Sequence, residues 1–520
     1  MNSHGSTPWF GETDRDGQAG MASISVSINP ALVGTAALRG VPLDAFLAGG
    51  PDRNPLLTFR DGKAPVQTFT YNGDESLHLC ALIPLPGVGE VLGATGNLMV
   101  GTRVYSLLLE LFRGKLCRIQ NQASDWQLLG LELPSDILQR LRQLTHRLVT
   151  IVTSPNPVPE DDVCLAALAE AHVLGNDLTD VYIHRLFELR TQKQGPLSTV
   201  LSVGMPEDLE PVDFKAYGSH LAPFDHLHLP LSWRALEPEA GKPNLAKLNL
   251  WVEAAKATGK KLTAGPLLDF RAQGLPDWVL KGSTDPHQIT ALLSKHVRHL
   301  IASHGSHFDS WTVLLGANLS EVFDFDEDEW LRMAYHLCDE AKRAGKNLKL
   351  SLGVSQPWGE IMSIEHRNHS PFSFAETVVR TGLPIASIAL DMVMGTLPRG
   401  GYVRDGIETS KMIDQFAFLG KPLKILTGFP SSSDSDLLAD STVHLAGGHL
   451  GLGHSPKGQA LWAETMLPLM LSKAAVEEVR WCHLDDRRPH THPNCGLIDS
   501  KGNANPTLEV LKKLKAQYLK

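Results

Sequence analysis

The sequence lacks most of the patterns that assign a chain to a special class. Its six widely separated cysteines form no Cys-x-x-Cys pair and no zinc-ligand spacing, which favours free buried thiols in a reducing compartment. No apolar run is long enough to span a bilayer, so no membrane partner is expected. The net charge of -9 is spread along the chain, which argues against a nucleic-acid partner.

The N-terminus lacks the features of a secretory signal. Its first 20 residues are polar and rich in Gly, Asp and Ser, with no basic stretch followed by an apolar core. We therefore expect a disordered leader over residues 1–21 and a cytoplasmic location. Because a single hydrophobic core rarely serves 520 residues, we expect two domains after that leader.

Residues 22–193 are expected to form an N-terminal α/β module in which strands precede helices. Residues 23–28 and 66–71 alternate polar and apolar side chains with period two, which is typical of half-buried strands. Helical patterns follow in residues 105–113, 135–151 and 160–190, with a Pro-rich break at 154–157. The module carries no catalytic motif.

From residue 195 to 520, short apolar runs alternate with amphipathic stretches. Strands buried on both faces appear as continuous apolar runs, and helices between them imply parallel crossovers. Eight runs predict a (β/α)8 TIM barrel, whose ligand site lies at the carboxyl ends of the strands. The runs are residues 199–203, 224–229, 261–264, 310–315, 348–352, 385–390, 423–426 and 479–484, and the clearest helical stretches are 245–258, 286–304, 327–344 and 456–475.

A doubly wound parallel sheet is the structural alternative. Such a sheet ordinarily carries a phosphate-binding glycine loop after its first strand. The corresponding residues here, Val-Gly-Met-Pro at 203–206, do not form one. The barrel is therefore the favoured fold.

Several segments of the second half, in the same order, resemble motifs of the family-10 glycoside hydrolases, the xylanase family. Residues 232–241 (Ser-Trp-Arg-Ala-Leu-Glu-Pro-Glu-Ala-Gly) resemble Lys-Trp-x-x-x-Glu-Pro-x-x-Gly. Residues 265–270 and 275–278 resemble Gly-His-x-Leu-x-Trp and Leu-Pro-x-Trp, and residues 311–317 resemble Trp-Asp-Val-Val-Asn-Glu-Ala. Residues 481–485 and 496–499 resemble the last strand and its Gly-Leu-(Leu/Phe)-Asp turn. The resemblance implies a glycoside-hydrolase barrel.

The same resemblance places glycine at both catalytic glutamate positions. The acid/base position is Gly316 and the nucleophile position is Gly428. A retaining glycosidase needs two carboxyl groups about 5–5.5 Å apart, and glycine supplies none. The sugar-gripping positions differ as well, whereas framework residues match, so the resemblance implies the fold and leaves the mechanism open. The differing positions are His228, Leu229, Ser232, Pro266 and residues 391–393.

Other carboxylates at strand ends are candidates for chemistry. Glu360 follows the fifth strand and Asp391 ends the adjacent sixth, so the two could approach to glycosidase distance. We expect Glu360 as acid/base, its pKa raised by an apolar wall at Trp358, and Asp391 as nucleophile or base. Asp269, which closes the third strand, is the reserve. The alternative for each is a carboxylate that caps a loop or pairs with an arginine.

Aromatic and amide groups are candidates for substrate binding. Aromatics just after strands could stack on sugar rings, and polar groups could bond hydroxyls. The alternative is that the aromatic residues fill the gap between barrel and loops. The candidates are Trp233, Phe270, Arg271, Asn318, Gln356, Trp358, Phe429 and Asp485, the last being expected to be mainly structural.

Two polar segments near the C-terminus are candidates for cation or phosphate binding. Residues 431–436 form a Ser/Asp run that is expected to be a solvated loop. His483, His490 and His492 lie near Asp485 and Asp486, but with no His-x-x-x-His or His-Glu-x-x-His spacing. We therefore expect no metal and no cofactor.

The expected function is that of a glycoside-hydrolase-like protein that acts on or binds a poly- or oligosaccharide. Two alternatives stay open: an inactive pseudo-glycosidase that still binds glycan, and a scaffold whose N-terminal module binds a protein. The oligomeric state cannot be inferred from the sequence.

Overall fold

The computed structural model describes residues 20–29, 44–50, 53–62, 65–154, 161–206, 208, 211–271, 274–319, 322–365 and 369–520. The expected leader lies outside these ranges up to residue 19, and Met21 opens the first strand. The expected Pro-rich break lies outside them from residue 155. Within the described ranges, no helix is both long and apolar enough to cross a membrane.

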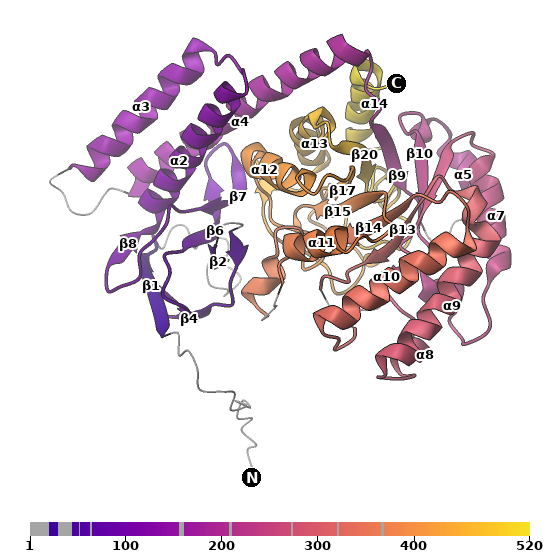
Figure 1. Ribbon diagram of the computed structural model, residues 1–520. Helices are drawn as coiled ribbons and strands as arrows, with labels where there is room; N and C mark the ends of the chain where they lie inside the picture. Colours follow the sequence, from indigo (N-terminus) through magenta and orange to yellow (C-terminus); the bar gives the residue numbers. More distant parts are fainter. Residues whose placement is uncertain are drawn as a thin grey trace.

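The N-terminal part contains two small sheets (Figure 1). In the first, the order is β4-β5-β1-β8, and the period-two pattern of β1 buries Ile24 and Val26 completely. In the second, the order is β19-β7-β6-β2-β3. The strands are β1 (Met21–Ser27), β2 (Ala45–Gly49), β3 (Asn54–Pro55), β4 (Phe59–Asp61), β5 (Val66–Asn72), β6 (His78–Leu85), β7 (Gly89–Ala94) and β8 (Val104–Ser106).

One strand of the second sheet comes from the other half of the chain. β19 (His449–Leu450) pairs antiparallel with β7, so that His449 lies opposite Glu90. The two halves of the protein therefore share hydrogen bonds of one sheet.

Three helices follow the strands, and the last reaches the barrel. They are α2 (Leu107–Leu128), α3 (Ser135–Val152) and α4 (Asp161–Gln194). Figure 1 shows α4 running from the module to the barrel, where it contacts α12 (Gly406–Ala417) and α13 (Pro456–Ser472). Buried charges also join α2 to the start of α12: Lys115 Nζ lies 2.7 Å from Asp405 Oδ2, and Arg118 Nε lies 3.2 Å from Glu408 Oε1.

The second half is a closed barrel of eight parallel strands, as expected. Consecutive strands pair in parallel, and the ring closes through β9 with β20 and β11 with β13. The strands are β9 (Val200–Gly204), β10 (His226–Leu229), β11 (Lys261–Ala264), β13 (Ser310–Leu315), β14 (Leu350–Val354), β15 (Ser387–Val393), β17 (Leu423–Gly428) and β20 (Val476–Trp481). A short strand, β12 (Leu268–Asp269), extends the third position along β13.

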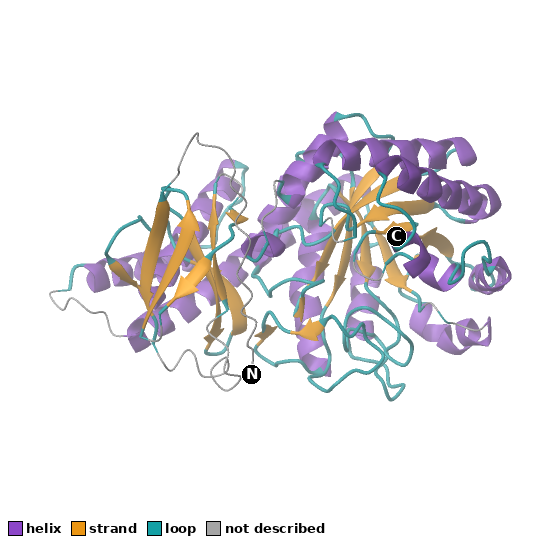
Figure 2. Ribbon diagram, turned by 90° about the horizontal axis from the view of Figure 1, so that it is seen from below, coloured by secondary structure: helices purple, strands orange, loops and turns teal. Residues whose placement is uncertain are grey.

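One helix follows each barrel strand, and these helices surround the sheet (Figure 2). They are α5 (Pro211–Tyr217), α7 (Leu245–Lys256), α9 (Pro286–His304), α10 (Glu327–Ala344), α11 (Pro371–Arg380), α12, α13 and α14 (Thr507–Tyr518). Short elements lie in the loops: α6 (Trp233–Leu236), α8 (Asp277–Leu280), β16 (Thr396–Leu397) and β18 (His444–Leu445).

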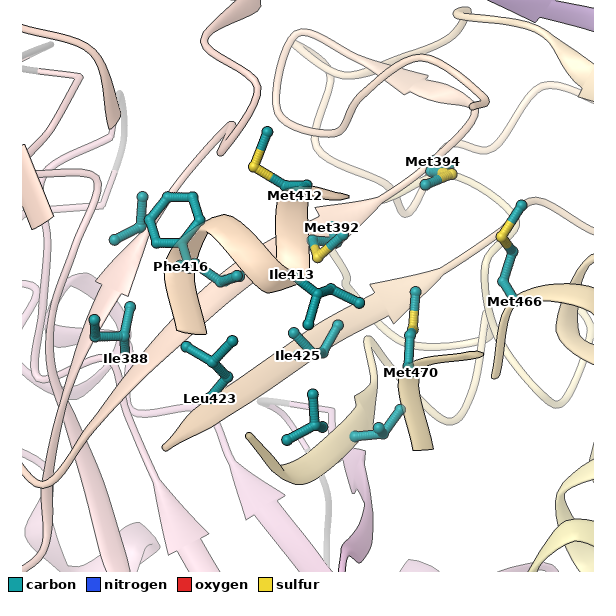
Figure 3. Packing of buried hydrophobic residues seen from close by; sticks show 14 of the residues in the cluster. Ile388, Met392, Met394, Met412, Ile413, Phe416, Leu423, Ile425, Met466 and Met470 are labelled. Atoms are coloured by element: carbon teal, nitrogen blue, oxygen red, sulfur yellow. The ribbon is translucent and has the colours of Figure 1, made fainter. Parts of the chain in front are cut away.

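Apolar side chains hold the helices to the strands. Figure 3 shows Ile388 and Met392 of β15 and Ile425 of β17 packed with Ile413 of α12 and Met470 of α13. All five are fully buried. Burial of one such side chain contributes about 1.5–3 kcal/mol, so this layer fixes where the neighbouring strand ends lie.

Charged groups fill part of the barrel interior. Glu478 of β20 bonds Arg480 Nη2 at 2.8 Å and Ser202 Oγ at 2.6 Å, and it lies 3.3 Å from Lys424 Nζ. Burial opposes ionisation of Glu478, but Arg480 and Lys424 hold the pKa of this carboxyl well below its usual range. The network forms the floor beneath the barrel mouth.

Candidate functional site

A cavity of about 430 Å³ opens at the carboxyl ends of the barrel strands. Its walls come from the ends of β10, β12 and β15 and from the loop after β20. This is where ligand sites of such barrels lie. Among the expected site residues, its lining includes Trp233, Asp269, Arg271 and Asp391.

Arg271 occupies the space beside the first glycine position. A Cβ added to Gly316 would lie 2.5 Å from Arg271 Cγ, and Gly316 has a positive φ of 75°. The stem of Arg271 therefore fills the space that a side chain at position 316 would occupy.

This crowding predicts a strong effect of adding a side chain at this position. Gly316→Ala is expected to destabilise the protein by about 2–4 kcal/mol, since left-handed strain and overpacking add. Gly259→Ala is the matched control, because Gly259 has a φ of 73° with open space around its Cβ, and it should cost about 1 kcal/mol. Denaturant unfolding of both variants measures the difference. Equal losses would contradict the crowding by Arg271.

The Arg271 guanidinium joins two carboxylates. Its Nη2 lies 2.7 Å from Asp269 Oδ2, and its Nη1 lies 3.4 Å from Asp391 Oδ2. Both acids therefore lie well within the ~10 Å over which carboxyl pairs act in glycosidases. Asp269 is bound bidentately and held as the counter-ion of Arg271.

Asp391 is the acid whose protonation is most altered in this cavity. It is buried at the mouth end of β15, and its Oδ1 has no hydrogen-bond partner among the described residues. Burial raises the pKa of Asp391 to about 6, against the opposing effects of Arg271 and the Val393 backbone. The group can therefore hold a proton near neutral pH and release it there.

Cys482 occupies the space beside the second glycine position. A Cβ on Gly428 would lie 2.5 Å from Cys482 Sγ. Cys482 is partly exposed and lines the cavity, and its Sγ lies 3.5 Å from His483 Nδ1. The His483 ring in turn places Nε2 2.7 Å from Asp486 Oδ1. Arg271 and Cys482 thus occupy the space beside Gly316 and Gly428.

The thiol and the imidazole form a charged pair. Burial opposes ionisation of Cys482, but a hydrogen bond from Cys495 and the positive His483 lower the pKa of Cys482 to about 5. Burial also disfavours the imidazolium, yet the Cys482 thiolate and the Asp486 hydrogen bond raise the pKa of His483 to about 10. These shifts favour a thiolate at Cys482 and an imidazolium at His483.

A second histidine extends the network. The His490 ring stacks on His483 at 4.3 Å between centroids, and its Nε2 lies 2.9 Å from Asp436 Oδ2. Donor atoms of His483, Asp486 and His490 lie within 4.8 Å of one another. Each imidazole nitrogen already has a partner, the fourth being the Arg488 carbonyl at 2.7 Å from His490 Nδ1. The cluster is thus complete as a hydrogen-bonded network.

One residue of the expected polar loop after the seventh strand, Asp436, belongs to this network. Asp436 was expected to be solvated with no base nearby, but its carboxylate is buried against His490 and the Asn494 backbone N–H. His492 instead bonds Thr396 Oγ1 at 3.0 Å and lines the cavity.

Glu360 and Trp358 are turned away from the mouth. Glu360 Oε1 pairs with Arg404 Nη1 at 2.8 Å, and the Arg404 guanidinium lies 4.3 Å from the centroid of the Trp358 ring. Trp358 and Arg404 line a different cavity of about 1070 Å³ between the module and the barrel. Glu360 is not among the residues that line the mouth cavity and is paired with an arginine from the loop after β15, so its expected role beside Asp391 stays a prediction.

The other aromatic candidates pack inward. Phe270 and Phe429 are fully buried, Phe270 against Trp330 and Phe429 against Trp462. Trp233 borders the cavity but is only 2% exposed and stacks on a histidine ring. The described mouth therefore lacks the open aromatic surfaces that were expected, and its walls combine apolar and polar side chains.

The amide candidates and Asp485 tie loops together. Asn318 bonds the Ser355 backbone through both amide atoms, at 2.8 and 3.1 Å. Gln356 donates to the Pro398 carbonyl and accepts from the Ile361 N–H. Asp485 is fully buried and bonds Tyr217 and Arg487.

Sequence reasoning missed Cys482, His483 and Asp486 as one constellation. The local signal was present: a cysteine and a histidine are adjacent at the end of the eighth apolar run, and an aspartate follows three residues later. The cysteines were expected to be buried, whereas Cys117 is exposed and Cys482 is partly so.

Comparisons with known proteins return no matching family model. Solved structures similar to the chain include xylanase 10B from Thermotoga maritima, at 14% identity over 64% of this chain and 98% of that chain, with a TM-score of 0.45. Xylanase 10B from Thermotoga petrophila in complex with xylobiose shares 17% identity over 64% and 97%, with a TM-score of 0.46. A family-10 enzyme from Paenibacillus barcinonensis shares 16% over 62% and 97%, with a TM-score of 0.46.

Proposed function

We propose that the barrel binds a short carbohydrate at its mouth and hydrolyses a glycosidic bond there, with Asp391 as general acid. The observation that carries this proposal is the buried Asp391 carboxyl, which lies at a strand end in the cavity with a pKa raised to about 6. A carboxyl group of that pKa is protonated often enough near neutral pH to protonate a leaving oxygen.

The size and lining of the cavity support a small polar ligand. Its volume of about 430 Å³ lies in the lower part of the roughly 300–1,000 Å³ found for small-molecule sites. Guanidinium groups of Arg271 and Arg399 line it and supply N–H donors for hydroxyl oxygens. A chain end or short oligosaccharide fits this site better than a long polymer.

Two observations favour the inactive alternative, in which the mouth binds glycan without cleaving it. Asp269 is neutralised by Arg271, so it is not poised as a second free carboxylate. The buried Phe270 and Phe429 also leave little aromatic surface for a sugar ring. The scaffold alternative is less favoured, since the module is already bonded to its own barrel through β19 and Asp405.

A panel of plant and bacterial polysaccharides and short oligosaccharides tests the proposal. The pure protein is incubated with each sugar, and both reducing-end release and binding are measured. Release from short substrates supports hydrolysis. Binding without release supports the inactive alternative. The absence of both release and binding would contradict a carbohydrate role.

The hydrolysis rate is expected to depend on pH through Asp391. Because the acid must carry its proton, the rate should fall as pH rises through about 6, the pKa of Asp391. The measurement is kcat/KM between pH 4 and 9. A rate that rises through this range would contradict the assignment.

A further inference from the structure

Cys482 is placed where a reacting group of this cavity is expected. It directly follows β20, and among the residues that line the mouth cavity it is the one cysteine. Its Sγ lies over Gly428 at the end of β17, with 2.5 Å to the site of the missing Cβ. The sulfur therefore occupies the space that a side chain at position 428 would fill.

The thiol is held in position by a relay of buried groups. His483 Nδ1 lies 3.5 Å from Sγ, and His483 Nε2 bonds Asp486 Oδ1 at 2.7 Å. The same carboxylate oxygen accepts the Gly496 N–H at 2.8 Å, which fixes its orientation. A cysteine, a base and an acid that orients the base are the parts of an activated thiol nucleophile.

Asp391 shares the cavity with this thiol. In the pairing of β15 with β17, Asp391 lies opposite Leu426 and Val393 lies opposite Gly428. Cys482 Sγ lies beside Gly428, two residues further along β17 than the pairing partner of Asp391. The negative Cys482 also contributes to the raised pKa of Asp391, so the two groups interact directly through space.

The charged groups around this pair come from several elements. Those that act on Cys482 are His483, Asp486 and the Cys495 thiol. Those that act on Asp391 are Arg271, Asp269 and Cys482. Burial and the negative Cys482 favour a proton on Asp391, whereas the Cys495 hydrogen bond and His483 favour negative charge on Cys482.

We propose that Cys482 is the nucleophile of this site and forms a covalent thioglycosyl intermediate with a sugar bound at the barrel mouth. This inference rests on the proposed carbohydrate function. His483 and Asp486 act as positioning residues that keep the thiol ionised.

The reaction balances without an oxidant or a cofactor. In the first step, the thiolate forms a bond to the anomeric carbon, the glycosidic carbon–oxygen bond breaks, and the leaving oxygen takes the Asp391 proton. In the second, Asp391 takes a proton from water, the water oxygen bonds the anomeric carbon, and the carbon–sulfur bond breaks. One water is consumed, and thiolate and protonated Asp391 are restored with retained anomeric configuration.

The first test measures the thiolate without any sugar. The native full chain is alkylated with iodoacetamide under reducing conditions from pH 5 to 9, and each cysteine peptide is quantified by mass spectrometry. Cys117, which is exposed, is the internal reference. At pH 6, Cys482 should react about tenfold faster than Cys117, and His483→Gln should remove that advantage. Slower labelling of Cys482 than of Cys117 at every pH would overturn the assignment of Cys482 as nucleophile.

The second test traps the intermediate. The protein is incubated with 2,4-dinitrophenyl 2-deoxy-2-fluoro-β-xyloside and -β-glucoside, and the modified peptide is sequenced. A glycosyl adduct on Cys482, with retention of configuration by NMR on a turned-over substrate, is the expected result. Cys482→Ser should lower the hydrolysis rate at least about 10²-fold, whereas Cys117→Ser should leave it unchanged.

The outcomes separate this inference from the proposed function. Hydrolysis with inversion, or an adduct on a carboxylate, would show that Cys482 is not the nucleophile. Either result would remain consistent with the proposed carbohydrate function. Absence of both hydrolysis and adduct overturns the function itself. If alkylation is then still fast at pH 6, the role of Cys482 toward sugars is overturned while the thiolate–imidazolium pair is confirmed.

Discussion

Asp391→Asn is expected to lower the hydrolysis rate by about 10²–10⁴-fold, the range by which a positioned general acid accelerates a reaction. The substitution keeps the side-chain shape and the contact with Arg271 but removes the proton that titrates at about pH 6. The remaining rate of the variant should also no longer decrease as the pH rises above 6. Steady-state kinetics with the best substrate of the panel measure both effects.

Glu360→Gln is the informative comparison for this variant. The sequence favoured Glu360 as the acid, whereas its carboxylate pairs with Arg404 at the junction. The rate of Glu360→Gln should therefore stay close to that of the unmodified protein. A large loss in Glu360→Gln with none in Asp391→Asn would reverse the assignment.

Glu478→Gln is expected to lower the free energy of unfolding by about 3–5 kcal/mol, the cost of removing one partner from a buried ion pair. Glu478 is 3% exposed and faces both Arg480 and Lys424. Without its charge, two buried cations face each other with no strong counter-ion. Denaturant unfolding at pH 7 measures the loss.

Glu477→Gln is the matched control, because this neighbour is 44% exposed and lies 3.9 Å from Lys424. It should change the free energy of unfolding by less than about 1 kcal/mol. A similar loss of unfolding free energy in both variants would contradict the stabilising role of the buried Glu478 network.

The pH dependence of stability has a defined sign. The pKa of Glu478 is lowered in the folded protein, so its contribution is complete above the unfolded value of about 4.3 and is lost as pH falls below it. The difference in stability between the unmodified protein and Glu478→Gln should therefore shrink below about pH 4.

The barrel could be predicted from the sequence because its signal is local. The third apolar run, residues 261–264, and the helical stretch 286–304 coincide with β11 and α9. Buried parallel strands need continuous apolar runs, and the amphipathic helices between them need apolar residues that repeat about every 3.6 positions. Both patterns can be recognised in a single sequence. The pairing of β19 with β7 joins segments more than 350 residues apart and leaves no such local pattern.

The site was harder to predict because side-chain direction at a strand end depends on the loop that follows. Phe270 and Trp358 follow strands, yet one packs into the core and the other lies under Arg404. Asp391 could be proposed from its place at the end of the sixth run. Its raised pKa could not, since that depends on how deeply the carboxyl is buried and on how far Arg271, from the loop after β12, opposes the effect of burial.

Reducing-end release by the unmodified protein from short oligosaccharides at about pH 5.5 tests the central claim most directly. That pH lies between the lowered pKa of Cys482, about 5, and the raised pKa of Asp391, about 6. The account predicts release that increases linearly with protein concentration and time. A folded protein that neither releases reducing ends nor binds any sugar of the panel would contradict it.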